Sequence, residues 1–156
     1  SLINRLSGGA KAKAEDRPGV TVSKQWVTTK IGVDLLDMPG VLWPKFDDER
    51  VGENLAAIKA IKDDILDTER IATALCSRLR ALYPERLSER YKLGDMDRYA
   101  DLEDWELVEA IGKKRGFLVS GGEVNYERTC NTLLSEFRSG AIGRITLEAA
   151  DDEADV

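Results

Sequence analysis

The sequence predicts an α/β segment followed by an all-α domain. Residues 25–36 hold two short runs of β-formers on either side of a glycine-containing turn, a pattern typical of a β-hairpin. From Arg50 to the end of the 130s, apolar residues recur at the 3.6-residue spacing of amphipathic helices. The change of period near residue 47 marks the boundary that we expect between the two parts.

We expect three parts in the chain: residues 1–47, a helical domain at residues 48–147, and an acidic tail at residues 148–156. A chain of 156 residues is long enough to bury a real core. The net charge is −6, and residues 141–156 alone hold five acids against one arginine. The overall charge therefore does not decide which partners the protein binds.

Several classes of protein are excluded by what the sequence lacks. No run approaches the ~20 apolar residues of a membrane span, and residues 1–5 do not show the order of a secretory leader. The absence of histidine excludes histidine-based acid–base chemistry and most zinc sites. Cys76 and Cys130 show no metal spacing, so we expect buried thiols in a cytoplasmic protein.

The chain opens on a helical pattern that has no visible start. Leu2, Ile3 and Leu6 share a helical face, and the serine and two glycines that follow end it. This predicts that the sequence begins inside a longer protein. Residues 10–19 are predicted to form a loop.

The predicted hairpin consists of strands at Gln25–Thr29 and Val33–Leu36, and Asp37 lies where the second strand ends. In a parallel α/β sheet, ligands bind beyond the carboxyl ends of the strands. A carboxylate there, followed by a glycine that lets the backbone approach a phosphate, suits a nucleotide–Mg²⁺ site. The alternative is an ordinary strand and turn with a solvated aspartate.

The helical domain begins with a predicted helix and a second one that starts near Asp67 and ends before Pro84. The first has an apolar stripe made of Val51, Leu55, Ile58 and Ile61. The second buries Ile71, Leu75, Leu79 and Leu82. Both stripes follow the helical period, so both are expected to face the core.

Three further helices are expected, at Pro84 to Tyr91, Asp101–Lys114 and Asn125–Arg138. The fourth helix is predicted to face the core through Leu102, Trp105, Val108 or Glu109, and Ile111 or Gly112. The fifth is predicted to do so through Thr129, Leu133, Leu134 and Phe137. Residues 142–147 are expected to form a short extended segment.

Four stretches, in this order and spacing, resemble the circularly permuted ribosome-assembly GTPases. They are Leu2-Ile3-Asn4-Arg5-Leu6, Arg17-Pro18-Gly19-Val20-Thr21, Asp37-Met38-Pro39-Gly40-Val41 and Leu42-Trp43-Pro44-Lys45. Gly112-Lys113-Lys114-Arg115-Gly116, Ser120-Gly121-Gly122 and Asn125-Tyr126 are similar to the helical domain of such proteins. The resemblance covers residues 1 to about 147. It implies a partial P-loop GTPase core, of which residues 1–47 are the C-terminal part.

The resemblance assigns roles to two switch loops. Thr21, after Pro18 and Gly19, resembles the switch-I threonine that meets Mg²⁺ and the γ-phosphate, and such a loop orders with GTP and loosens after hydrolysis. The alternative for Thr21 is a solvated residue at the start of a strand. Asp37 resembles the acid that holds a magnesium-bound water.

Switch II continues through Met38, Pro39 and Gly40, and Gly40 resembles the glycine whose N–H senses the γ-phosphate. Many GTPases then place a glutamine that orients the attacking water, and this chain has Val41 instead. A valine side chain forms no hydrogen bond. The water must therefore be oriented by another residue, by a bound cation such as K⁺, or by the partner, and no catalytic residue is assigned.

Two nucleotide-binding motifs are absent from the 156 residues: the Gly-Lys-Ser/Thr end of a phosphate loop and a guanine-reading Asn-Lys-x-Asp. In a circularly permuted GTPase both precede the helix that Ser1 opens, so an N-terminally shortened chain lacks them. Ser1 matches the position after the magnesium-binding hydroxyl and is not assigned as a ligand. We therefore expect this chain alone to hydrolyse GTP poorly.

The resemblance implies that the helical domain binds ribosomal RNA. Lys113, Lys114 and Arg115 cluster at a helix end, where cations contact phosphates without reading sequence, and Arg128 adds to them from the last helix. A second basic edge is predicted from Arg78, Arg80, Arg86 and Arg90. The alternative is a helical scaffold, because acids lie between these cations.

The sequence thus predicts a monomeric GTPase that acts as a checkpoint in large-subunit assembly, with GTP or GDP and Mg²⁺ as ligands. GTP orders the switches, the helical domain grips the rRNA of the large ribosomal subunit, and hydrolysis triggers release. The alternative is a non-catalytic RNA- or protein-binding helical module with a relic of the GTPase. The residues upstream of Ser1 distinguish the two.

Overall fold

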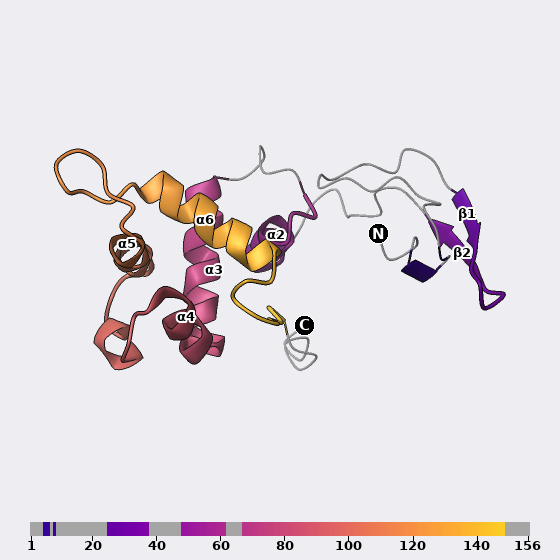
Figure 1. Ribbon diagram of the computed structural model, residues 1–156, viewed down its shortest axis with the longest axis horizontal. Helices are drawn as coiled ribbons and strands as arrows, with labels where there is room; N and C mark the ends of the chain where they lie inside the picture. The colour runs from indigo at the N-terminus through magenta and orange to yellow at the C-terminus, as the bar shows by residue number, and fades with distance from the viewer. Residues whose placement is uncertain (1–4, 7, 9–24, 38–47, 62–66, 149–156) are drawn as a thin grey trace. The chain divides into compact units, whose positions relative to one another are not determined.

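A computed structural model describes residues 5, 6, 8, 25–37, 48–61 and 67–148 of the chain, and for Gln25 and Asp37 it describes the backbone only. The chain divides into two compact units, residues 1–47 and 48–156. The first contains a two-stranded sheet and the second a group of helices (Figure 1). The expected combination of a small α/β segment with a helical domain is confirmed.

The hairpin predicted in the first unit is present. Strand β1, Gln25–Thr28, pairs antiparallel with β2, Asp34–Asp37, in a register that places Trp26 opposite Leu36. Thr29 closes the turn, because its hydroxyl donates to the Val33 carbonyl at 2.8 Å and accepts from the Val33 N–H at 3.1 Å. The predicted second strand was Val33–Leu36. The observed β2 is displaced from it by one residue, because Val33 belongs to the turn and Asp37 is the last residue of the strand.

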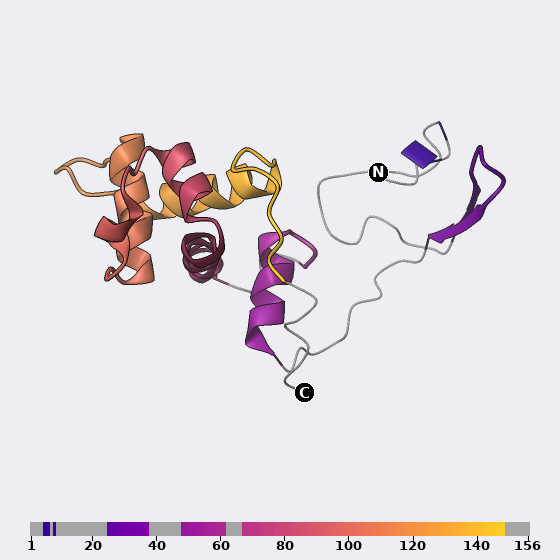
Figure 2. The same cartoon turned by 90° about the horizontal axis from the view of Figure 1, so that it is seen from below.

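The second unit is built around one helix. α3, Thr68–Leu82, contacts the other four α-helices (Figures 1 and 2). These are α2, Glu49–Ala57; α4, Pro84–Tyr91; α5, Asp104–Arg115; and α6, Tyr126–Arg138. A short 3₁₀ helix, η2, Met96–Tyr99, lies between α4 and α5 and was not predicted.

The helix starts follow from local capping. The side chains of Asp48, Asp67 and Asn125 each accept a backbone N–H of the first turn of α2, α3 and α6, which satisfies one of the otherwise unpaired donors there. α5 begins at Asp104 and not at the predicted Asp101. The reason is a capping box, in which the Glu103 N–H donates to the Glu106 carboxylate at 2.9 Å.

The core is one apolar cluster that all the α-helices share. α3 contributes Ile71, Leu75, Cys76 and Leu79, and the other helices add Ala56, Ala57, Leu87, Tyr91, Leu107, Val108, Ile111, Cys130, Leu133 and Leu134. The prediction for the two cysteines is confirmed, because both are buried and unbridged. Burial raises the pKa of the Cys130 thiol to about 12, so it stays protonated at neutral pH.

Three expected core positions are exposed, and three more, Val51, Leu55 and Leu102, are only partly buried and lie outside the core cluster. Ile58 is 54% exposed and Trp105 51% exposed, and Leu82 is exposed as well. α2 instead turns its small residues inward: Gly52, Asn54, Ala56 and Ala57. Small side chains allow close approach, and Arg138 at the end of α6 donates to the carbonyls of Ala56 at 3.0 Å and Ala57 at 2.9 Å.

The segment after α6 is not a strand between Ala141 and Glu148, contrary to the extended segment expected there. Ile142 is buried in the core, and the Thr146 backbone pairs with the Tyr83 hydroxyl. The segment then runs beside α2, where Asn54 donates to Glu148 at 2.6 Å (Figure 2). Side-chain contacts therefore replace a ladder of strand hydrogen bonds. In the described part of the chain, no helix is long and apolar enough to cross a membrane.

We predict that Gly112→Ala destabilises the helical unit. A Cβ at this position of α5 would lie 2.6 Å from the Thr129 hydroxyl oxygen on α6 and would also collide with the Val124 side chain. Overpacking of this kind costs about 1–3 kcal/mol, against a gain of about 1 kcal/mol in helix propensity. Urea unfolding should show a net loss of about 1 kcal/mol, and at most about 2 kcal/mol, in the free energy of unfolding. Lys114→Ala, on the exposed face of α5, serves as the control, and equal stability of the two variants would contradict the close approach.

Candidate functional site

The predicted nucleotide switches belong to the first unit, and most of their residues lie outside the described part. These are Pro18, Gly19, Thr21, Met38, Pro39, Gly40 and Val41. Asp37 is the one predicted switch residue whose backbone the structure describes. It ends β2 and pairs with Gln25. Its position at the end of a strand agrees with the sequence, and the Mg²⁺ roles of Thr21 and Asp37 stay predictions. The residues that the structure describes contain no group of three acids or cysteines placed to bind a metal.

The predicted RNA-binding residue Arg115 has internal partners. It forms an ion pair with Glu136 on α6, and its guanidinium lies 5.3 Å from the centre of the buried Tyr91 ring. Arg90 from α4 binds the same carboxylate through two hydrogen bonds, of 2.7 and 3.0 Å. Glu136 is only 16% exposed, so one carboxylate joins α4, α5 and α6.

This arrangement determines the titration of Glu136. Burial raises the pKa of its carboxyl, but hydrogen bonds from Arg90 and Arg115 outweigh burial, and the net pKa is below its ordinary value of 4.5. Because the folded pKa is lowered, the group stabilises the fold fully above its unfolded pKa. That contribution is lost as the pH falls through the folded pKa.

Three other predicted RNA-binding cations remain on the surface. Lys114 is exposed and has no ion pair with any described residue, and Lys113 pairs only with Glu109, at 3.3 Å across an exposed helix turn. Such a pair contributes little and exchanges easily. The guanidinium carbon of the exposed Arg128 lies over the Phe117 ring, 4.4 Å from the ring centre, and Arg128 forms no ion pair among the described residues.

The second basic edge largely serves the fold. Arg78 binds Glu53 at 3.0 Å. Arg80 binds Asp104 at 2.6 Å and donates to two backbone carbonyls. Arg90 is held by Glu136. Of these four arginines, only Arg86 lacks an acidic partner among the residues that the structure describes, and its guanidinium lies 5.9 Å from the Tyr83 ring centre.

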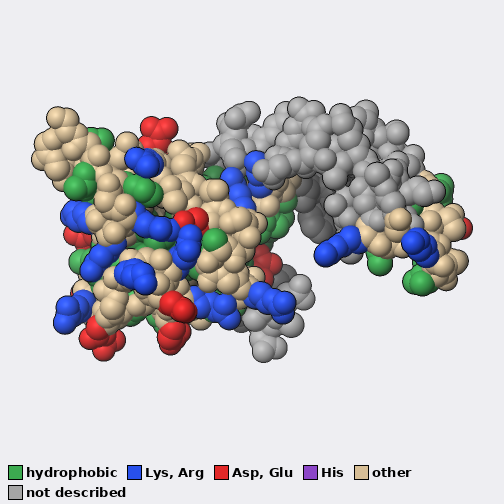
Figure 3. All heavy atoms as spheres, in the orientation of Figure 1, with side chains coloured by type: hydrophobic (Ala, Val, Ile, Leu, Met, Phe, Trp, Pro, Cys, Tyr) green, Lys and Arg blue, Asp and Glu red, His purple; other side chains and the backbone are tan. Residues whose placement is uncertain are grey.

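Figure 3 shows lysine and arginine side chains spread over the visible face of the helical unit, above α4, α5 and α6, with acidic side chains mainly at its edges. Cations thus gather on this face although the net charge of the whole chain is −6. A local cation field attracts a polyanion regardless of net charge. The face is therefore the candidate nucleic-acid interface.

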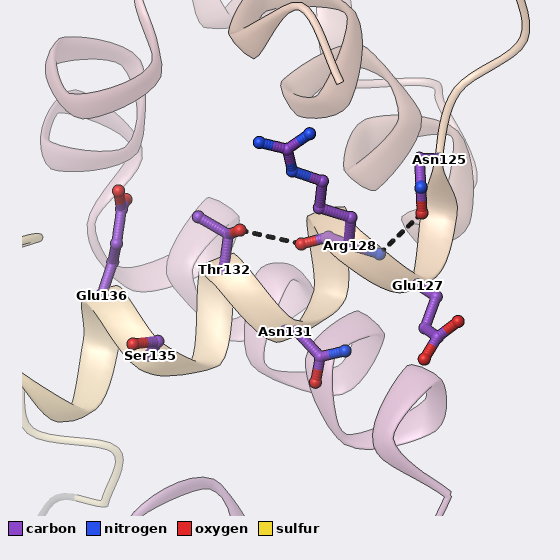
Figure 4. A pocket seen from close by; sticks show the side chains of 7 residues that line it. All are labelled: Asn125, Glu127, Arg128, Asn131, Thr132, Ser135 and Glu136. Atoms are coloured by element: carbon purple, nitrogen blue, oxygen red, sulfur yellow. Dashed lines mark hydrogen bonds between the residues drawn. The ribbon is translucent and has the colours of Figure 1, made fainter. Parts of the chain in front are cut away.

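A polar hollow, here called the α6 hollow, lies along the outer side of helix α6. It is lined by Asn125, Glu127, Arg128, Asn131, Thr132, Ser135 and Glu136 (Figure 4). Asn125 caps the helix by accepting the Arg128 N–H at 3.0 Å, and the Thr132 hydroxyl donates to the Arg128 carbonyl at 2.8 Å. Both bonds hold the backbone that carries Arg128. Figure 4 shows Arg128, Thr132 and Glu136 projecting to one side of the helix and Glu127 and Asn131 to the other.

Sequence reasoning missed part of this surface. Asn131 and Ser135 lie four residues apart and therefore share one exposed face of α6, and Phe117 supports Arg128 from the loop after α5. The spacing of Asn131 and Ser135 was visible in the sequence. The Phe117–Arg128 contact was not, because it joins two elements through the turn between them.

The family of the chain is decided by a match to a family model. Residues 1–86 match the model described as 50S ribosome-binding GTPase. The chain belongs to this family. The match spans the predicted switch residues and continues through α2 and α3 into the start of α4.

Similar proteins agree with membership of the 50S ribosome-binding GTPase family. Ribosome biogenesis GTPase A of Bacillus cereus is 44% identical over 153 residues, which cover 97% of this chain and 50% of that protein. The protein of the same name from Bacillus pumilus is 45% identical over 148 residues, or 95% and 51%. The chain thus spans about half the length of these curated relatives. The resemblance to ribosome-assembly GTPases noted in the sequence is confirmed at this level, and circular permutation stays a prediction.

A solved structure supports the fold. The structure titled as GDP-bound TM YlqF superposes with a TM-score of 0.57 at 23% identity, covering 97% of this chain and 55% of that one. At this identity the likeness concerns the fold alone. It agrees with a partial GTPase core followed by helices.

We predict that Glu136→Gln destabilises the helical unit by about 2–3 kcal/mol at pH 7, because two partly buried guanidiniums lose their shared carboxylate. The loss should shrink as the pH falls below the ordinary pKa of about 4.5, and it should vanish below the lowered folded pKa, where the wild-type carboxylate is itself protonated in the folded protein. Thermal unfolding of both proteins across pH measures this. Glu109→Gln, which breaks only the exposed pair with Lys113, should cost less than about 0.5 kcal/mol. An equal cost for Glu136→Gln at pH 3 and pH 7 would contradict the ionic role.

Proposed function

We propose that this chain forms part of a GTPase that acts in assembly of the large ribosomal subunit. Residues 1–47 carry the switch residues that sense Mg–GTP, and the helical unit binds rRNA. Membership of the 50S ribosome-binding GTPase family supports the GTPase role. The single observation that carries the RNA-binding role is the set of surface cations with no buried partner, Lys113, Lys114 and Arg128.

The nucleotide site is proposed from chemistry at the end of β2. Hydroxyl and carboxylate oxygens are the donors that Mg²⁺ prefers, so Thr21 and Asp37 suit it, directly or through a water. A bound Mg²⁺ would neutralise charge on the phosphates. Gly40 offers a backbone N–H to the γ-phosphate without steric hindrance from a side chain, and Pro18, Gly19, Met38 and Pro39 shape the loops.

The proposed cycle links the two roles. GTP orders the loops around Thr21 and Gly40 while the helical unit holds rRNA. Hydrolysis to GDP loosens the loops, and the protein then dissociates from the ribosomal particle. Val41 offers no hydrogen bond to the attacking water, so its orientation comes from elsewhere, for example from K⁺ or the ribosomal particle. We expect the protein to act in the cytoplasm and to be a monomer.

A second candidate function is a non-catalytic RNA-binding module. It is favoured by the division of the chain, because residues 48–156 form a compact unit of their own that carries the exposed cations. We predict that these 156 residues alone bind GTP more weakly than about 100 μM, because neither a phosphate-loop lysine nor a base-reading motif is present. Titration with a fluorescent GTP analogue and a phosphate-release assay measure this. Micromolar affinity with turnover would refute the prediction.

RNA binding is tested with Lys113→Ala/Lys114→Ala. Arg115 is left in place, because its ion pair with Glu136 supports the fold. We predict roughly tenfold weaker binding to the large ribosomal subunit and a salt dependence that is shallower by about 0.7–0.9 for each lysine that contacts a phosphate. Filter binding at several salt concentrations gives both values.

The matched control for this experiment is Lys113→Arg/Lys114→Arg, which keeps both charges. Counterion release depends on the charge of the cation, so the control should retain the wild-type salt slope without a loss of affinity. An unchanged slope in the alanine variant would remove these lysines from the interface.

A further inference from the structure

A second groove on the helical unit differs in chemistry from the candidate nucleic-acid interface. It is here called the Trp105 groove, and side chains from α2, α3, α5 and α6 line it, among them Glu53, Asp67, Glu69, Ala74, Trp105 and Tyr126. The Thr73 hydroxyl of α3 and the Tyr126 hydroxyl of α6 form a hydrogen bond of 3.0 Å within it. The fold therefore brings segments distant in sequence to one surface, where they can contact one ligand.

Trp105 is the large apolar side chain that this groove leaves in water. It is 51% exposed, although the next turn of the same helix buries Leu107 and Val108. The partly buried Ala74 and Tyr126 line the groove with it, so the apolar area is not that of one isolated side chain. Apolar surface with a polar rim is typical of interaction sites, and tryptophan and tyrosine are enriched among the residues that contribute most to binding.

Part of the charge that lines the groove is compensated by arginines. Glu53 forms ion pairs with Arg70 at 3.3 Å and with Arg78 at 3.0 Å. Asp104, which also lines the groove, pairs with Arg80 at 2.6 Å. These carboxylates therefore serve the fold and attract a ligand weakly.

Two further carboxylates remain available. Asp67 and Glu69 are exposed, and neither forms an ion pair with any residue that the structure describes. Asp67 caps α3 by accepting the Glu69 N–H at 2.9 Å, which leaves its charge in place. The N-terminus of a helix contributes only about half a positive charge, so two full negative charges leave this end of the groove acidic.

We propose that the Trp105 groove binds a lysine- or arginine-rich segment of a partner protein. Such side chains combine an apolar stem with a charged head. The stem packs on Trp105 and Ala74, the head pairs with Asp67 or Glu69, and the indole ring adds its own attraction for a cation. RNA does not fit the groove, because the carboxylates repel phosphates. The inference adds a protein partner to the proposed function and does not depend on RNA binding.

The test titrates the 156-residue chain into a fluorescently labelled peptide of about 12 residues in which lysine or arginine alternates with serine. A second peptide carries glutamate in place of each cation and should not bind. The variants are Trp105→Ala, and Asp67→Asn/Glu69→Gln, in which asparagine still caps α3. We expect each variant to weaken binding of the basic peptide roughly tenfold. Fluorescence anisotropy gives the affinities, and circular dichroism confirms that each variant is folded.

The matched control is Glu85→Gln/Glu89→Gln, which removes the same charge from exposed positions of α4 that do not line the groove. Its affinity for the basic peptide should stay within about twofold of the wild-type value, because only distant charge is lost. If the control loses as much affinity as the groove variants, or if the wild-type chain does not bind the basic peptide, the groove is refuted as its site. RNA binding through Lys113 and Lys114 would stand in either case.

Tryptophan emission locates the peptide. In Trp26→Phe/Trp43→Phe, Trp105 is the only remaining tryptophan of the 156 residues. The basic peptide should shift its emission to shorter wavelength, because the apolar stems displace water from the indole. Binding without a change in Trp105 emission would overturn the proposal. The same shift on raising the protein concentration without peptide would overturn it too, because a second copy of the chain would then occupy the groove.

Discussion

Burial of the apolar face of α3 is the interaction on which the rest of the helical unit depends. Ile71, Leu75 and Leu79 are all fully buried, and every other α-helix contributes side chains to the same cluster. Fully burying a Leu or Ile contributes about 1.5–3 kcal/mol each, far more than an exposed ion pair. Because each helix must turn one face to α3, its opposite face is left to solvent. For α6 that outward face carries the hollow and Arg128 (Figure 4).

The arginines then divide into two groups according to what they touch. Arg80, Arg90, Arg115 and Arg138 hold helices and connections together through carboxylates or helix-end carbonyls. Arg128 and the neighbouring lysines have no such task. A planar guanidinium with five donors suits the first group, because it satisfies several buried acceptors at once. The division explains how an acidic protein keeps some cations exposed while it uses others internally.

Local signals in the sequence were sufficient for much of the fold. The Asp67 cap and Pro84 bound the two ends of α3, Asn125 begins α6, and the turn after Thr29 returns the hairpin. Each signal acts within a few residues, so it is legible without tertiary information. The orientation of α2, in contrast, could not be predicted from local signals. Its larger side chains form a helical stripe, but Ala56 and Ala57 face the core because close packing and the Arg138 bonds favour small residues.

The sequence by itself determined the family, through ordered motifs around Thr21, Asp37 and Gly40, and it placed a cation cluster at the end of α5. Only the tertiary structure decided which of those cations are available. Arg115 is adjacent to Lys114 in the chain, yet it turns to Glu136 while Lys114 stays in solvent. The reason is geometric: successive residues on a helix point about 100° apart, so where α6 packs on α5 determines which of them meets its carboxylate. That packing depends on contacts distant in sequence, such as Gly112 with Thr129, which no local pattern specifies.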